Sequence, residues 1–137
     1  MIMAYPVTKL DGMTAQAAGK LKKQGIRTTE KLIEVASLVR SRKRLAKETQ
    51  IPEAQLLEWV NIAHYLRIEG MGAAKAKLIR ATGVNTVRDL GFRNPERLAQ
   101  KMREANDKLK LVRALPSEPS VRLLIERARK HTSKITY

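Results

Sequence analysis

The chain has 137 residues, enough for one domain or for two small coupled halves with a real hydrophobic core. Lys and Arg total 28 against 13 Asp and Glu, and the net charge of +15 favours a polyanionic partner over a basic solvated surface or an acidic protein partner. The chain has no cysteine, which excludes disulfides, cysteine zinc sites and thiol catalysis, and no apolar run approaches the roughly 18 residues of a membrane span.

The composition favours helices. One Trp, three Tyr and one Phe stand among many Ala, Leu, Lys and Arg, which are residue types that prefer helices to strands. We therefore expect an all-α protein. Residues 1–4 are too short for the hydrophobic region of a signal peptide, so we expect a cytoplasmic location.

The first turn signal is the segment 10–14, Leu-Asp-Gly-Met-Thr. A helix is expected over residues 15–24, and either Thr14 serves as its N-cap or the turn is made there without positive φ. Thr28 likewise fits the N-cap of a second helix with a dense apolar face. We therefore expect a turn and two helices within the first part of the chain.

The most basic short run is Arg40-Ser41-Arg42-Lys43-Arg44. Alone, such a run indicates a solvated loop or a helix start as readily as a nucleic-acid contact. A separate short helix is expected over 45–49. It should end before Pro52, because the residue ahead of a proline avoids the helical region.

A longer helix is expected from Pro52 to Leu66. Its apolar residues form two stripes, which predicts burial on two sides and a central strut between the two halves of the chain. Trp59 is expected in the core and not as a platform for base stacking. The stripes are Leu56, Val60 and Ala63, and Trp59, Ile62 and Leu66.

The clearest turn follows that helix. Gly70 and Gly72 flank Met71, and glycine permits positive φ and a close approach of another backbone. A helix of about ten residues should start just after Gly72, with Gly83 placed to cap its C-terminus. The first N–H groups of such a helix form a ready anion site.

The two turns are related by an internal repeat of 58 residues. Residues 10–14 fall on residues 68–72 without a gap. Thr14 takes the place of Gly72, so the first copy is degenerate. The register continues with Leu21 on Ile79, Gly25 on Gly83, Ile26 on Val84, Thr28 on Thr86 and Leu32 on Leu90.

Three further helical segments complete the chain. Residues 87–90 start a helix that Gly91 interrupts, and Asn94 is a plausible N-cap for the next helix. A turn or kink is expected at 106–108. A final amphipathic helix should follow the loop over 116–120.

The glycine pair at 70 and 72, with Ala76, Ile79 and Gly83, resembles the helix-hairpin-helix motif of DNA repair and recombination proteins. In that family the hairpin's backbone amides hold a DNA phosphate without reading the base sequence. Together with the 58-residue repeat and the basic C-terminal half, the chain resembles a family of small microbial proteins built from two such repeats. That second resemblance implies a fold but no established activity, and its hairpins lie farther apart in sequence than those of ordinary tandem hairpin domains.

The resemblance implies that the second hairpin holds phosphate with its backbone and first-turn amides, with two lysines nearby. The degenerate first hairpin and the basic run are the other candidates. If the glycines serve only to turn two helices sharply, none of these residues binds a ligand. The candidate contacts are Gly12, Met13, Thr14, Arg40, Arg42, Lys43, Arg44, Gly70, Met71, Gly72, Ala73, Ala74, Lys75 and Lys77.

No catalytic constellation is recognisable, because the two histidines lie far apart and no acidic cluster has metal-ligand spacing. We expect no enzymatic activity, catalytic residue, cofactor, metal or small-molecule substrate. The hypothesis is sequence-independent binding of nucleic acid, duplex DNA first, with a nucleoid-associated location. A protein-interaction or assembly module that uses the hairpins for helix packing is one alternative, and a structured-RNA binder is the other.

The expected architecture has two helix-hairpin-helix repeats packed as one unit. Residues 1–66 hold the degenerate hairpin and the central buried helix. Residues 67–137 hold the second hairpin and the C-terminal helix. The second part is the more basic one, with 17 Lys and Arg against 7 Asp and Glu.

Overall fold

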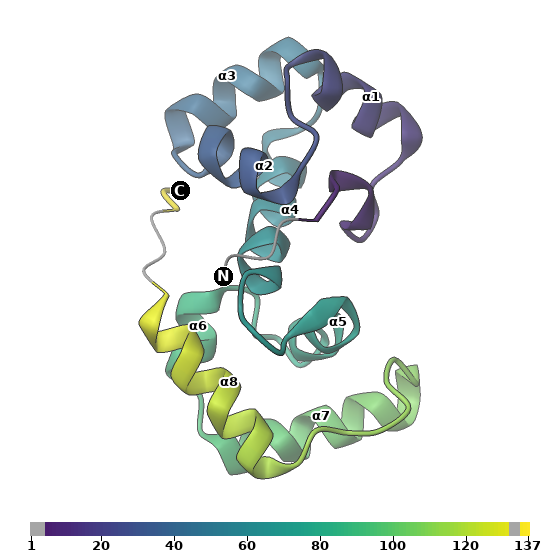
Figure 1. The fold of residues 1–137 in the computed structure, drawn as a ribbon, viewed down its shortest axis with the longest axis vertical. Helices are drawn as coiled ribbons and strands as arrows, with labels where there is room; N and C mark the ends of the chain where they lie inside the picture. The colour runs from purple at the N-terminus through teal and green to yellow at the C-terminus, as the bar shows by residue number, and fades with distance from the viewer. Residues whose placement is uncertain (1–4, 132–134) are drawn as a thin grey trace. The chain divides into compact units, whose positions relative to one another are not determined.

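The computed structural model describes residues 5–131 and 135–137 (Figure 1). All secondary-structure elements named within these residues are helices. This confirms the all-α fold class. Residues 1–4, which the signal-peptide argument used, lie outside the described residues. The elements are η1 (Val7–Lys9), α1 (Ala15–Lys23), α2 (Thr29–Ala36), α3 (Val39–Thr49), α4 (Glu53–Leu66), α5 (Gly72–Ala81), α6 (Val87–Gly91), α7 (Pro95–Leu109) and α8 (Glu118–Lys130).

The chain divides into two compact units. The first contains residues 5–64 together with 135–137, and the second contains residues 65–131. The division falls inside α4, close to the boundary expected after residue 66. Packing of the two units as one body stays a prediction. No helix within the described ranges is long and apolar enough to cross a membrane.

In the first unit, residues 5–7 are hydrogen-bonded to residues 27–29, around the connection between α1 and α2. The amide of Val7 donates to the carbonyl of Arg27 at 2.9 Å, and the amide of Thr29 donates to the carbonyl of Tyr5 at 2.7 Å. Trp59 is 3% exposed, which confirms its predicted place in the core. Other buried side chains of this unit are Leu10, Leu21, Ile26, Leu32, Leu45 and Leu56.

The second unit is built on α8, which packs against α6 and α7. A Cβ added at Gly91 would lie 3.2 Å from Cγ of Arg129, so a glycine lets α6 approach α8 closely. The buried Tyr65 hydroxyl donates to the carbonyl of Val84 at 2.7 Å. The core contains Tyr65, Ile68, Met71, Leu78, Ile79, Leu90, Leu98, Met102 and Ile125.

The two turns related by the 58-residue repeat share their backbone geometry. Gly12 has φ +79° and Gly70 has φ +83°. The amide of Met13 donates to the carbonyl of Leu10 at 3.1 Å, and the corresponding bond from Met71 to Ile68 measures 3.0 Å. Glycine is needed at both positions, because other residues rarely adopt such φ values.

The correspondence continues through the helix that follows each turn. Gly25 and Gly83 end these helices with φ +80° and +99°. Thr28 and Thr86 then cap α2 and α6, each with its hydroxyl oxygen accepting from the amide three residues later. Local geometry therefore repeats at the spacing predicted from the sequence.

Two helices are longer than the sequence predicted. The basic run and residues 45–49 form the single helix α3, which suits the helix-forming Arg and Lys side chains. Residues 106–108 form no turn, and α7 continues to Leu109. The side chain of Asn106 bonds the backbone of Val112 beyond the end of α7: Nδ2 donates to the carbonyl and Oδ1 accepts from the amide, each at 3.0 Å.

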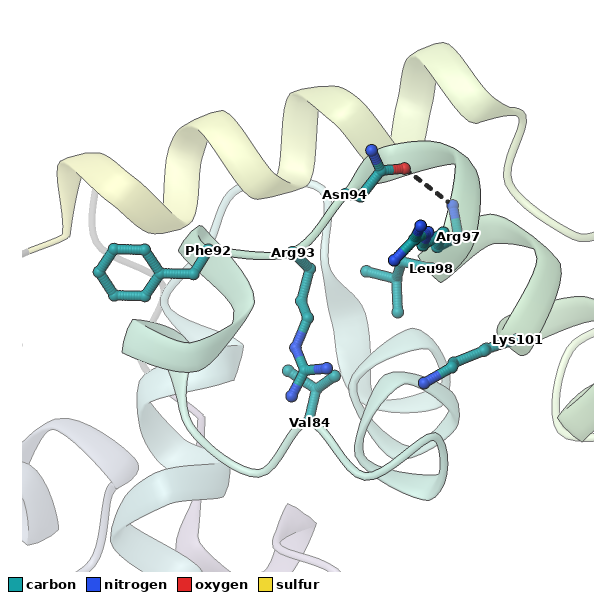
Figure 2. Close-up of a pocket in the computed structure, with 7 residues that line it drawn as sticks. All are labelled: Val84, Phe92, Arg93, Asn94, Arg97, Leu98 and Lys101. Carbon is teal, nitrogen blue, oxygen red and sulfur yellow. Dashed lines mark hydrogen bonds between the residues drawn. The ribbon is translucent and has the colours of Figure 1, made fainter.

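Helix α7 begins as predicted. The side-chain oxygen of Asn94 accepts a hydrogen bond from the amide of Arg97 at 3.0 Å, and Pro95 occupies the first turn (Figure 2). Proline suits this position because the first helical amides lack intrahelical partners. Asn94 thereby fixes where α7 starts after α6.

Candidate nucleic-acid interface

The second hairpin joins α4 to α5 within the second unit. Gly70 and Gly72 both have positive φ, +83° and +68°. Between them Met71 is 1% exposed and anchors the turn in the core. Because the Met71 side chain is buried, the exposed residues of the turn are Glu69 and the two glycines.

The first turn of α5 faces solvent. Gly72, Ala73 and Ala74 are exposed, and no side chain caps the helix at Met71. A Cβ added at Gly72 would meet no atom within 4 Å outside its chain neighbours and the backbone of its own helix. The first amides of a helix carry partial positive charge and lack intrahelical acceptors. This surface therefore combines backbone donors with open space for an anion.

Two cationic side chains hold the carbonyls of this turn. The ammonium of Lys75 donates to the carbonyl of Gly70 at 3.0 Å, and Nη1 of Arg127 donates to the carbonyl of Glu69 at 2.6 Å. Nη1 of Arg127 also lies 2.9 Å from where a Cβ of Gly70 would be. The hairpin is thus flanked by positive charge on α5 and on α8.

Sequence reasoning did not identify Arg127 as a site residue. It lies 58 residues after Glu69, near the end of a different helix. From the sequence alone, Arg127 is one of the cations in the last turn of α8, where positive charge stabilises the negative C-terminal end of the helix dipole. No local signal separates Arg127 from Arg129 and Lys130, because the contact exists only once α8 has folded against its unit.

The first hairpin differs from the second at Thr14, which takes the place of Gly72. Thr14 has φ −86°, and its hydroxyl oxygen accepts from the amide of Ala17 at 3.0 Å. This confirms Thr14 as the N-cap of α1. A first-turn amide is thus already bonded to a side chain, whereas the first turn of α5 has no such cap.

The donor that holds the first hairpin is also different. Asp11 corresponds to Glu69 in the repeat, and its carbonyl accepts from Nε1 of Trp59 at 2.9 Å. Indole is a neutral donor, whereas the guanidinium of Arg127 is charged. The equivalent carbonyl is therefore held by a buried aromatic side chain in the first unit and by a cation in the second.

The basic run forms one face of α3. Arg40, Lys43, Arg44 and Lys47 are all exposed, at spacings of three and four residues that place them on one side of a helix. Lys47 continues this stripe beyond the predicted run. A row of exposed cations along one helix face is an electrostatic footprint typical of nucleic-acid contact.

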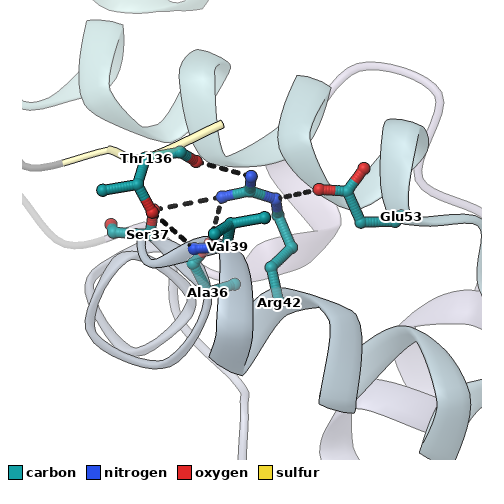
Figure 3. A network of polar contacts seen from close by, with 6 residues as sticks. All are labelled: Ala36, Ser37, Val39, Arg42, Glu53 and Thr136. Atoms are coloured by element: carbon teal, nitrogen blue, oxygen red, sulfur yellow. Dashed lines mark hydrogen bonds and ion pairs between the residues drawn. The ribbon is translucent and has the colours of Figure 1, made fainter.

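Arg42 does not belong to that face. Its side chain is fully buried, so the expectation that it contacts nucleic acid is corrected (Figure 3). Nε donates to Oε1 of Glu53 at 2.7 Å, and Nη1 donates to the carbonyls of Ala36 and Ser37. Nη2 donates to the carbonyl of Thr136 at 2.6 Å. These contacts engage all three guanidinium nitrogens within the protein.

Burial shifts the pKa of two groups of the second unit, Tyr65 and His131. Burial raises the pKa of the Tyr65 phenol well above 10.0. Burial and then the charge of Arg67 lower the pKa of His131 below 6.5. Within residues 5–131 and 135–137, no three His, Asp or Glu side chains are grouped so as to hold a metal ion.

The candidate contacts fall into two sets. Gly70 to Lys77 gather at one hairpin of the second unit, while Gly12 to Thr14 and the α3 face belong to the first. Residues 11–131 match the model of a protein family described as a domain of unknown function (DUF4332). The chain matches none of the curated proteins and none of the solved structures with which it was compared.

Proposed function

The chain belongs to the DUF4332 family, and we propose that it binds the phosphate backbone of nucleic acid, duplex DNA first, without reading base sequence. The second hairpin carries the proposal. Its exposed, uncapped first-turn amides lie beside two positive-φ glycines and two cations, Lys75 and Arg127. Backbone donors and cations recognise phosphate but carry no base information.

The charge distribution supports the same function. The protein carries +15, and residues 67–137 hold 17 Lys and Arg against 7 Asp and Glu. The exposed face of α3 adds Arg40, Lys43, Arg44 and Lys47 from the first unit. A protein of this kind would act as a DNA-associated binding protein in the nucleoid and not as an enzyme.

A titration of duplex DNA at several salt concentrations tests the proposal. Binding through about six phosphates should weaken roughly a thousandfold between 50 and 200 mM salt, because bound counterions are released from DNA. Duplexes of unrelated sequence should bind equally well. An affinity that does not change with salt, or a strong preference for one sequence, would contradict backbone binding.

The same preparation distinguishes the two alternatives. A structured RNA that displaces duplex DNA at lower concentration than unlabelled DNA does would favour RNA as the partner. Self-association that persists at high salt, without affinity for either nucleic acid, would favour an assembly module. Sedimentation at low and high salt measures this directly.

A further inference from the structure

A second basic feature of the second unit lies at the corner between α6 and α7. A pocket of about 280 Å³ opens there (Figure 2). Its floor is formed by the buried side chains of Val84 and Leu98. Arg93, Arg97 and Lys101 lie around this floor. The hollow therefore has an apolar base and a cationic rim.

The residues that line the pocket include three cations and no acid. Nη2 of Arg93 pairs with Oδ2 of Asp89 at 2.8 Å, and both side chains remain more than a third exposed. Arg97 and Lys101 stand four residues apart on α7 and are exposed. Like charges at this spacing destabilise a helix. A bound anion between them would relieve that repulsion.

Phe92 stands at the edge of the same pocket. It is the single phenylalanine of the chain and is 79% exposed. One exposed ring is ordinary on a protein surface, but Phe92 lines the same pocket as three cations. Figure 2 shows the ring pointing away from the pocket centre, into the space beside α6, while Arg97 and Lys101 point toward the hollow. The exposed ring is therefore available for stacking at the edge of the pocket, and not inside it.

We propose that this corner, consisting of Phe92, Arg93, Arg97 and Lys101, binds an unpaired stretch of DNA strand. A phosphate lies over the cationic rim and the neighbouring base stacks on Phe92. Single-stranded nucleic acid is bound elsewhere by this combination of aromatic faces and a cationic path. The inference rests on the proposed function, since it extends phosphate binding to a second place in the same unit.

The arrangement suits a strand better than a free nucleotide or a duplex. Since the ring points out of the hollow, a single small ligand in the pocket would leave Phe92 unused. A duplex keeps its bases stacked on each other, so it offers the ring no base face except at an end. A flexible single strand can place a phosphate in the hollow and its next base outside it.

Binding of three labelled probes tests the proposal. The first is a blunt duplex, the second is the same duplex with a single-stranded extension of about five nucleotides, and the third carries an abasic extension of equal length. Wild-type protein should bind the base-containing extension roughly 5- to 100-fold more tightly than the blunt duplex, as stacking of one base allows. The abasic extension should lose most of that gain.

The variant Phe92→Ala should remove the gain and leave the affinity for a blunt duplex nearly unchanged, because a duplex exposes base faces only at its two ends. Phe92→Leu keeps an apolar side chain without an aromatic face and should behave in the same way. Leu123→Ala is the matched control, because Leu123 is also an exposed apolar residue of this unit, on α8, and its loss should change nothing. Arg97→Gln and Lys101→Gln combined should lower the salt slope for the extended probe by about 0.7, the value for one phosphate of a single strand.

Three results would overturn the inference. Equal affinity for blunt and extended probes would refute it while leaving duplex binding by the hairpin intact. An equal loss for both probes in Phe92→Ala would show that the ring does not act on unpaired bases. If no probe binds at all, both this inference and the proposed function fail.

Discussion

The guanidinium of Arg127 donates a hydrogen bond to the backbone carbonyl of Glu69 at 2.6 Å. The equivalent carbonyl of the first repeat, that of Asp11, accepts instead from the indole of Trp59. The same turn is thus held by a neutral side chain in one unit and by a cation in the other. This difference, with Thr14 in place of Gly72, makes the second hairpin the better candidate for phosphate.

Arg127→Gln should weaken duplex DNA binding without unfolding the protein. The change removes a charge beside the hairpin and a hydrogen bond that positions it, and we expect a loss of roughly three- to tenfold. Fluorescence anisotropy measures the affinity. Arg122→Gln is the control, because Arg122 lies on the same helix but pairs with Glu118. Equal losses from the two variants would mean that only net charge matters.

Gly72→Val should weaken duplex binding at least tenfold, because the new side chain would project into the open space in front of the hairpin. Gly25→Val controls for backbone strain, since Gly25 also has positive φ, +80°, and open space at its Cβ position. Both variants should lose about 1 kcal/mol of stability. Thr14→Val should leave binding nearly unchanged.

Lys75→Ala tests the charge beside the hairpin, together with the hydrogen bond from Lys75 to the carbonyl of Gly70. Loss of one phosphate contact from a lysine should mainly lower the salt slope by about one. Circular dichroism establishes that each variant is folded. If Thr14→Val and Gly72→Val lose equal affinity, the asymmetry between the hairpins is refuted, and if neither loses any, the glycines serve only helix packing.

Arg42→Ala should destabilise the protein by about 3 kcal/mol, because it leaves Glu53 and three backbone carbonyls without their charged donor. Arg40→Ala, on the exposed face of the same helix, should change the free energy of unfolding by less than about 0.5 kcal/mol. Urea denaturation measures both. Similar stabilities of the two variants would show that the guanidinium of Arg42 contributes little to the fold.

Tyr65→Phe should lower the free energy of unfolding by about 1–3 kcal/mol, because the carbonyls of Val84 and Thr86 lose their donor. Wild-type stability should also fall at high pH. The pKa of the phenol is raised in the folded state above its ordinary 10.0, so the folded state holds the proton more tightly. The stability that the protonated phenol of Tyr65 contributes is complete below pH 10 and is lost as the pH rises from 10 toward the raised pKa of the folded state.

Urea denaturation of the wild-type protein between pH 8 and pH 11 checks this dependence of stability on pH. Tyr65→Phe is the control for this measurement. The variant lacks the titrating phenol, so its stability should decline less over the same pH range. Parallel pH profiles of the two proteins would show that Tyr65 is not the group responsible.

Much of the local structure was predictable from the sequence alone. Gly12, Gly70 and their neighbours predict two turns, because only glycine readily adopts their φ values. Thr14 and Asn94 predict helix starts, because their side chains satisfy first-turn amides. The 58-residue repeat follows from residue identities and agrees with the backbone geometry. These features depend on contacts within a few residues of each other.

What only the tertiary structure decided depends on contacts between distant segments. Arg42 and Arg40 have the same chemistry in the sequence, but the packing of α3 buries one of them against Thr136 and leaves the other in solvent. Arg127 reaches Glu69 only because α8 returns to the hairpin of its unit. Composition and periodicity determine that the chain is helical and basic. Which cations remain available to a polyanion is set by where the folded chain supplies competing carbonyls and carboxylates.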